Sequence, residues 1–222
     1  MTKQASAAAG WRKMAMQTII GAIAGAGGML AVTSLMERQH GLDWVPSQII
    51  LVGIGFVYAL MGLFVGFGTM APHLFGQRML NVADAEEIVE QRSSMGSSAL
   101  SCLIRGAALM LLAYAVTADA AGAAVPVTPA TAYAILLAVL AGFVAASLWM
   151  WKNFDELWRQ LTVDVSAITG QILMLAGIVW GGAAAAGLTT GPHPLDLVSL
   201  AFGSMLLACF VAAGRRGMMA PR

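Results

Sequence analysis

Apolar residues in this sequence are gathered into long stretches that contain no Asp, Glu, Lys or Arg. These stretches are Met14–Met36, Trp44–Met70, Ala120–Trp151, Val165–Leu195 and Leu197–Gly214. A helix needs about 20 mostly apolar residues to cross roughly 30 Å of hydrocarbon, and four of the five stretches exceed that length. The two-residue alternation of membrane β-strands is absent. The pattern therefore predicts an all-α, polytopic helical membrane protein.

Six transmembrane helices account for the stretches, as a single transmembrane domain over residues 1–222. Each span should be helical, because backbone amides in the bilayer core have no water to bond. The longest loop, 72–96, follows the second span, and within it Asn81–Arg92 predicts a short acidic helix with Asn81 as its N-cap. The expected spans are about 14–36, 47–71, 97–118, 130–151, 164–187 and 195–214.

The basic residues predict the orientation of these spans. Lys and Arg are enriched in cytoplasmic loops, and ten of the twelve here fall on one side of the predicted spans. Arg38 is alone on the other side, and Arg105 lies inside span three. We therefore expect both termini and the 72–96 loop to be cytoplasmic. The ten are Lys3, Arg12, Lys13, Arg78, Arg92, Lys152, Arg159, Arg215, Arg216 and Arg222.

Composition narrows the class of partner. The chain is 59% hydrophobic and 10% charged, whereas soluble domains carry about 25% charged residues. Its net charge of +1 offers no basic face for nucleic acid. The expected partners are the lipid bilayer and other membrane proteins or further copies of the chain. Cys102 and Cys209 both fall within predicted spans, where we interpret them as small buried hydrophobic residues.

Arg105 is the one charge well inside a predicted span, about 12 Å from the cytoplasmic end at 1.5 Å per residue. An ionisable residue at such depth is a functional candidate whose partner must be sought. Asp164 is the candidate partner, because its span begins on the same side. Alternatively, the long Arg105 side chain extends back to the interface and has no further role.

A second group of charges precedes span five. Asp155, Glu156 and Arg159 are followed by Asp164, and Asp155 and Arg159 are spaced to pair on one helical face. This D-E-x-x-R pattern loosely resembles small, uncharacterised multispan membrane proteins of α-proteobacteria, over roughly 15 of the 222 residues. The resemblance implies a bacterial inner-membrane location and no specific activity. The segment is either an interfacial helix that extends span five or a vestibule in which Asp164 binds a cation or proton.

Glycine spacing and histidine placement leave further alternatives open. The pairs Gly62/Gly66 and Gly177/Gly181, like Gly21/Gly25, are spaced four apart and predict close helix packing, either within the chain or between copies. His73 follows a glycine-rich end of span two, which is either a broken helix near an ion site or a frayed helix end. Two H-x-L-D strings, His40–Asp43 and His193–Asp196, precede spans two and six. They offer either metal ligands or helix caps, and we favour caps.

No nucleotide-binding, metalloprotease or hydrolase motif occurs in the sequence. We therefore expect no catalytic residues, bound cofactor or resident metal. Short loops, few intramembrane charges and many small residues favour an accessory or structural subunit of a membrane assembly. A small transporter or channel for an ion or small solute is the alternative, supported by Arg105, Asp164 and weak sequence echoes that would fit repeated helical hairpins. A lipid-acting enzyme is a third alternative, for which the sequence offers no nucleophile. The candidate functional residues are Arg105, Asp164, Asp155, Glu156, Arg159 and His73.

Overall fold

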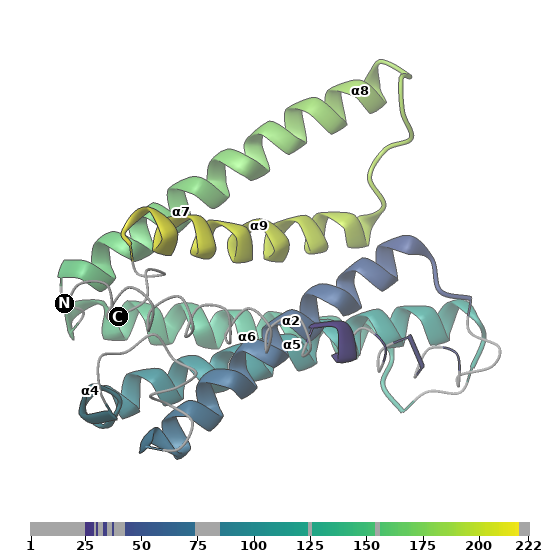
Figure 1. Cartoon of the computed structure of the whole chain (residues 1–222). Coiled ribbons are helices and arrows are strands. Elements are labelled where there is room, and N and C mark those ends of the chain that lie inside the picture. The colour runs from purple at the N-terminus through teal and green to yellow at the C-terminus, as the bar shows by residue number, and fades with distance from the viewer. Residues whose placement is uncertain are drawn as a thin grey trace, which may run out of the picture.

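The computed structural model describes residues 25–28, 30, 33–34, 37, 43–73, 85–123, 126–153 and 156–217. Over these residues the chain is helical, and five helical segments are long and apolar enough to cross a membrane. They run in alternating directions, so that their ends gather at two opposite ends of the bundle (Figure 1). The prediction of a polytopic helical membrane protein is confirmed. Most of predicted span one, 14–36, falls outside the described residues.

Helices α2 (Pro46–Met70) and α5 (Arg92–Ala120) form the centre of the molecule. Their backbones approach closely because glycines face each other at the crossing. A Cβ atom built on Gly62 would lie 2.7 Å from the Ala99 carbonyl oxygen, and one on Gly55 would lie 2.9 Å from the Gly106 carbonyl oxygen. Small residues at a helix interface allow this approach in membranes. The Gly62/Gly66 pair thus packs within the chain.

The main core surrounds this crossing. It is built from α2, α5, the first turns of α6 (Pro129–Met150) and the adjoining face of α9 (Pro194–Arg215). Helix α6 contributes only Ala132 and Leu136 as buried residues, and its later turns are largely exposed. The largest fully buried hydrophobic side chains of this core are Leu51 of α2 and Leu109 of α5. The tightest packing of α6 therefore lies near its start.

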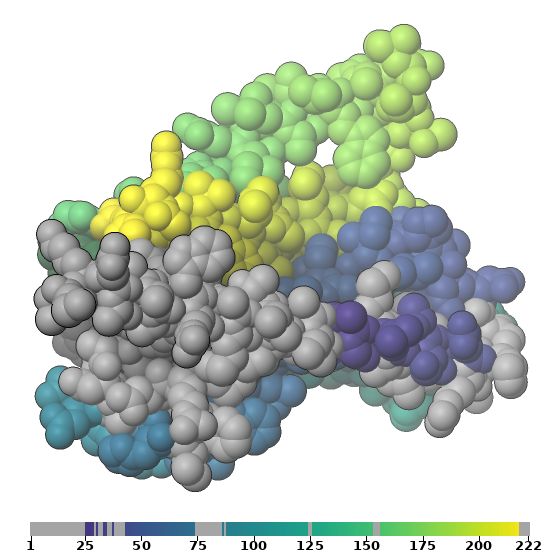
Figure 2. Space-filling view, in the orientation of Figure 1, coloured from purple at the N-terminus to yellow at the C-terminus, as the bar shows by residue number. Residues whose placement is uncertain are grey.

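The fifth apolar segment contains α7 (Glu156–Ala176), a π-helical turn η3 (Gly177–Gly181) and α8 (Gly182–Ala185). It packs mainly on α9, and the two diverge from the start of α7 toward α8 (Figure 1). None of its most apolar 18-residue window is buried. In Figure 2 its far end projects from the rest of this face. This segment is the least enclosed part of the described bundle.

The predicted helix bounds agree with the observed ones to within a few residues at most ends. Two helices begin earlier than their predicted spans, α5 by five residues at Arg92 and α7 by eight at Glu156. The extra residues of α5, 92–96, are mostly polar, whereas those of α7, 156–163, mix polar and apolar side chains. For α7 the structure shows one helix that extends predicted span five, and its place at the membrane interface stays a prediction. A short 3-10 helix, η2 (Trp151–Asn153), follows α6.

Two capping predictions have different outcomes. His193 is the N-cap of α9, and its Nδ1 accepts a hydrogen bond from the Leu195 N–H at 3.4 Å. The N–H of His193 donates to the Asp196 carboxylate at 2.8 Å, so Asp196 takes part in the cap as the third helical residue. Asp43 does not cap α2. Val45 is the N-cap of that helix, and its N–H donates to Oε1 of Gln48 at 3.0 Å. The Pro46 ring, which suits the first helical position, places the start of α2 too late for Asp43 to reach.

The predicted acidic helix in the 72–96 loop is present as α4 (Ala85–Glu90). Its proposed cap, Asn81, lies outside the described residues. A single turn residue, Gln91, separates α4 from α5. Ile88 of α4 is fully buried, so this short helix is held by packing as well as by its backbone hydrogen bonds.

Candidate functional site

Arg105 is the buried charge of the described bundle, with only 6% of its surface exposed. Its Nε donates to the backbone carbonyl of Ser101 at 3.2 Å, one turn back along α5. The guanidinium carbon lies 4.0 Å from the centroid of the Phe143 ring on α6. The side chain thus extends toward the start of α5, as expected if it reaches back to the membrane interface. Its guanidinium group, however, is covered by an aromatic ring.

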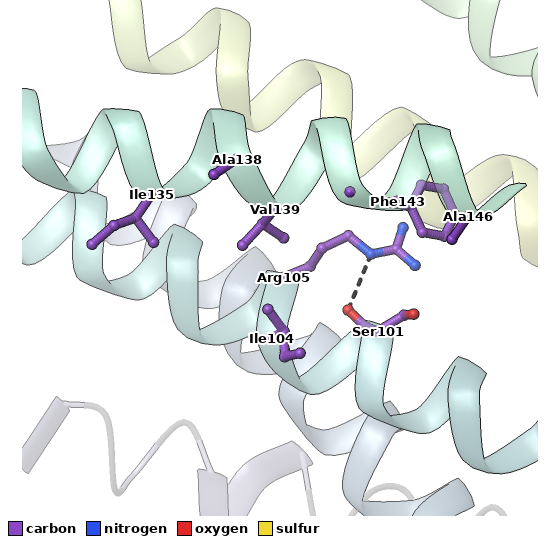
Figure 3. A pocket seen from close by; sticks show the side chains of 9 residues that line it. Ser101, Ile104, Arg105, Ile135, Ala138, Val139, Phe143 and Ala146 are labelled. Carbon is purple, nitrogen blue, oxygen red and sulfur yellow. Dashed lines mark hydrogen bonds between the residues drawn. The ribbon is translucent and has the colours of Figure 1, made fainter.

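A pocket of about 490 Å³ surrounds this side chain between α5 and α6. Figure 3 shows Arg105 projecting from α5 across the pocket toward Phe143. The guanidinium is the charged group of the lining, and most other groups are aliphatic. The lining residues are Ser101, Ile104, Arg105, Ile135, Ala138, Val139, Gly142, Phe143 and Ala146.

Tyr58 links the Arg105 region to two further helices. The Arg105 guanidinium carbon lies 5.6 Å from the Tyr58 ring centroid, and the Tyr58 hydroxyl donates to the Phe202 carbonyl of α9 at 3.2 Å. The Tyr58 and Phe202 rings meet edge to face at 5.9 Å. A cation over an aromatic ring is stabilised by the ring quadrupole, more strongly where water is excluded. Four helices therefore meet around this arginine.

Asp164 does not pair with Arg105. Its carboxylate accepts two hydrogen bonds from Arg216, at 2.6 Å from Nη2 and 3.1 Å from Nε. Nη1 of Arg216 also donates to Oε1 of Gln160 at 3.4 Å. The reason is topological: Asp164 lies on α7, which packs mainly on α9, and Arg216 directly follows α9. The expectation that Arg105 and Asp164 form an ion pair is therefore wrong, because α7 packs mainly on α9 and not on α5.

The remaining members of the D-E-x-x-R segment are dispersed. Asp155 lies outside the described residues, so its pairing with Arg159 stays a prediction. Arg159 donates from Nη2 to the Trp151 carbonyl at 3.4 Å, and its guanidinium lies 5.8 Å from the Trp151 ring. Glu156 accepts a hydrogen bond from Gln160 at 2.7 Å. These contacts join the start of α7 to η2 and do not converge on a binding site.

His73 is exposed just beyond α2 and lies apart from the Arg105 pocket. Helix α2 continues through Gly66 and Gly68 and ends at Met70, where the Thr69 hydroxyl donates to the Gly66 carbonyl at 2.8 Å. The backbone leaves the helical conformation at Ala71, and residues 72–73 are again helical. The residues that follow lie outside the described part of the chain, so both alternatives for this segment stay open. Within the described ranges, no three His, Cys, Asp or Glu side chains are grouped as metal ligands.

The sequence interpretation missed the groups that enclose Arg105. Phe143 and Tyr58 lie on different helices, and neither is adjacent to Arg105 in the sequence. A signal existed in their chemistry, because aromatic rings are preferred neighbours for a buried guanidinium. It was too general to select two positions among the eight Phe and three Tyr of the chain.

The fold and this site define a multi-pass helical membrane protein with one buried arginine between its third and fourth predicted spans. Comparisons with protein families, curated proteins and solved structures find no match for this chain. The resemblance to small α-proteobacterial membrane proteins accordingly stays a prediction.

Proposed function

We propose that this protein is an accessory or structural subunit of a bacterial inner-membrane assembly, and that it docks a partner's transmembrane helix on α7. The observation that carries the proposal is the packing of the α7–α8 segment. It is 30 residues long, yet none of its most apolar window is buried. A helix whose main neighbour is a single other helix retains most of its surface for lipid or for a partner.

The two glycine pairs of the chain provide an internal comparison. Gly62 and Gly66 face α5, where the Cβ atom of Ala99 would lie 3.8 Å from one built on Gly66. Gly177 and Gly181 have the same spacing, but a Cβ on either would meet nothing within 4 Å. Ser166 and Gly170 are exposed on α7, and Gly170 is equally open. Their spacing from Gly177 places all three on one face at 3.6 residues per turn.

Docking a helix on this face has a physical reason. Apolar side chains gain little by leaving lipid for protein, so helix association in membranes depends on close backbone approach and interhelical hydrogen bonds. The open glycines of α7 and η3 permit such an approach. Gln171 on the same helix exposes a side-chain amide, and a neighbouring helix would provide that amide with hydrogen-bond partners.

The transport alternative has less support, because Asp164 does not pair with Arg105 and instead binds Arg216. We also propose that the end of the bundle where α5 and α7 begin faces the cytoplasm, because Arg92, Lys152 and Arg215 gather there. Reporter fusions after Lys152 and after Arg215 should both report the cytoplasm, and a split result would contradict this orientation.

The docking proposal is tested by isolating the protein in mild detergent and measuring the mass of the complex. Gly177→Leu should release the partner, because a leucine side chain blocks close backbone approach. Gly53→Leu is the matched control, since it is equally open but lies on α2, outside the α7–α8 segment. Loss of the partner from both variants, or from neither, would contradict docking on this face. Recovery of a complex made only of copies of this chain would contradict an accessory role.

A further inference from the structure

Arg105 carries a charge, has only 6% of its surface exposed and lies next to an open pocket. Across the part of the chain that the structure describes, Asp164–Arg216 is the ion pair recorded, and Arg105 has no carboxylate partner. A charge removed from water is costly unless it is paired. The Ser101 carbonyl and the Phe143 ring stabilise the cation partly, and neither carries a negative charge. An anion is the group that this pocket lacks.

The apolar part of the pocket has room for most of one lipid chain. On α6 it extends from Ile135 to Gly142, a separation of 142 − 135 = 7 positions, or about 10 Å at 1.5 Å per residue. One leaflet of the bilayer provides about 15 Å of hydrocarbon, half of roughly 30 Å, so the pocket covers about two thirds of that length. The volume of about 490 Å³ lies within the range of about 300–1,000 Å³ that is usual for ligand pockets.

The polarity of the pocket is arranged like that of a lipid. The guanidinium lies beside Phe143, at the end of the pocket nearer the start of α5 and the end of α6 (Figure 3). Ile135 and Val139 line the other end, nearer the start of α6. A lipid of the adjacent leaflet has the same order, with its phosphate toward the membrane surface and its chain toward the midplane.

The charge of the pocket selects the headgroup. An Arg guanidinium binds phosphate oxygens with two parallel hydrogen bonds. No carboxylate is among the residues that line the pocket, so an ammonium group of a zwitterionic headgroup would have no counter-charge there. An anionic headgroup matches the charge of the site, and the adjoining apolar groove can hold an acyl chain.

We propose that the pocket between α5 and α6 binds one anionic glycerophospholipid, with its phosphate on Arg105 and one acyl chain along Ile135, Val139 and Gly142. The lipid neutralises the guanidinium and fills the space where α6 leaves the core. The site is separate from α7, so this inference is independent of the proposed docking of a partner.

The experiment is native mass spectrometry of the purified protein, titrated with phosphatidylglycerol or with phosphatidylcholine of identical acyl chains. The wild type should bind the first phosphatidylglycerol at least about ten-fold more tightly than phosphatidylcholine. Both lipids offer the phosphate, but phosphatidylcholine adds a quaternary ammonium that has no counter-charge among the lining residues and is repelled by Arg105. Arg105→Gln should abolish this preference. Equal affinity for the two lipids, or an unchanged preference in Arg105→Gln, would overturn the proposal.

A second variant tests the pocket with the arginine intact. A Cβ on Gly142 would meet nothing within 4 Å, so Gly142→Leu should fold while its side chain fills the groove. It should weaken phosphatidylglycerol binding by about ten-fold or more. Gly53→Leu, on an equally open position of α2, should bind like the wild type. Binding by Gly142→Leu at wild-type strength would contradict the chain site.

Inorganic phosphate distinguishes a lipid from a free anion. The proposal predicts that millimolar phosphate leaves the bound phosphatidylglycerol in place, because the apolar groove contributes to lipid affinity and not to phosphate affinity. Displacement of the lipid by phosphate at equal concentration would show that the headgroup alone is recognised, and would overturn the assignment of the groove.

Discussion

The substitution Gly62→Ala, at the crossing of α2 and α5, gives the sharpest prediction about stability. The added Cβ would lie 2.7 Å from the Ala99 carbonyl oxygen and 2.8 Å from the Leu103 backbone nitrogen. Both atoms belong to the α5 backbone, which cannot yield without moving the helix. Placing an extra carbon into a packed core costs about 1–3 kcal/mol.

Gly66→Ala is the matched control at the same interface. Its Cβ would lie 3.8 Å from the Ala99 side chain, which is an ordinary contact. Replacing helical glycine by alanine favours the helix by about 0.5–1 kcal/mol, and both variants share this gain. We therefore expect Gly66→Ala to be neutral or slightly stabilised. Gly62→Ala should be about 2 kcal/mol less stable than Gly66→Ala, a factor of about 30 in the unfolding equilibrium.

Reversible unfolding in mixed micelles, with increasing SDS and a helicity readout, measures this difference. Comparing the two alanine variants cancels changes in helix propensity and in the unfolded state. If Gly62→Ala is as stable as Gly66→Ala, the close approach of the α2 and α5 backbones is wrong, and with it the placement of the core around this crossing.

Two further predictions use the same unfolding measurement. Tyr58→Phe keeps the ring against Phe202 but removes the hydroxyl that donates to the Phe202 carbonyl. The free energy of unfolding should fall by about 1 kcal/mol. An unchanged free energy would show that this hydrogen bond does not hold α2 to α9. Asp164→Asn should cost no more than about 1 kcal/mol, because the side chains of Arg216 and Asp164 are 22% and 47% exposed and exposed ion pairs contribute little. A larger loss would indicate that water is excluded from the pair.

The class and most helix bounds followed from the sequence because they depend on local quantities. Hydrocarbon thickness sets the length of an uncharged stretch, and proline marks the start of α2, α6 and α9. The cap of α9 was also predictable, since Asp196 and His193 are three residues apart. Each of these inferences needs only residues that are close along the chain.

Neighbours of the candidate residues could not be derived in this way. Arg105 was correctly placed inside a helix, but its aromatic neighbours come from α2 and α6, and Asp164 binds Arg216 across 52 positions of sequence. In a soluble helix the apolar stripe identifies the face toward the core. In these helices apolar side chains cover every face, so hydrophobicity does not distinguish a face on lipid from a face on protein.

The amino-acid order by itself determined the helical membrane class, the approximate spans and the buried charge on the third of them. The tertiary structure alone decided which helices are adjacent. Two glycine pairs have the same spacing, yet Gly62 packs against α5, whereas a Cβ on Gly177 would meet nothing within 4 Å. The physical reason is that spanning a bilayer depends on the transfer of each segment into hydrocarbon. Pairing of helices depends on how two surfaces fit, and that property exists only when both are in place.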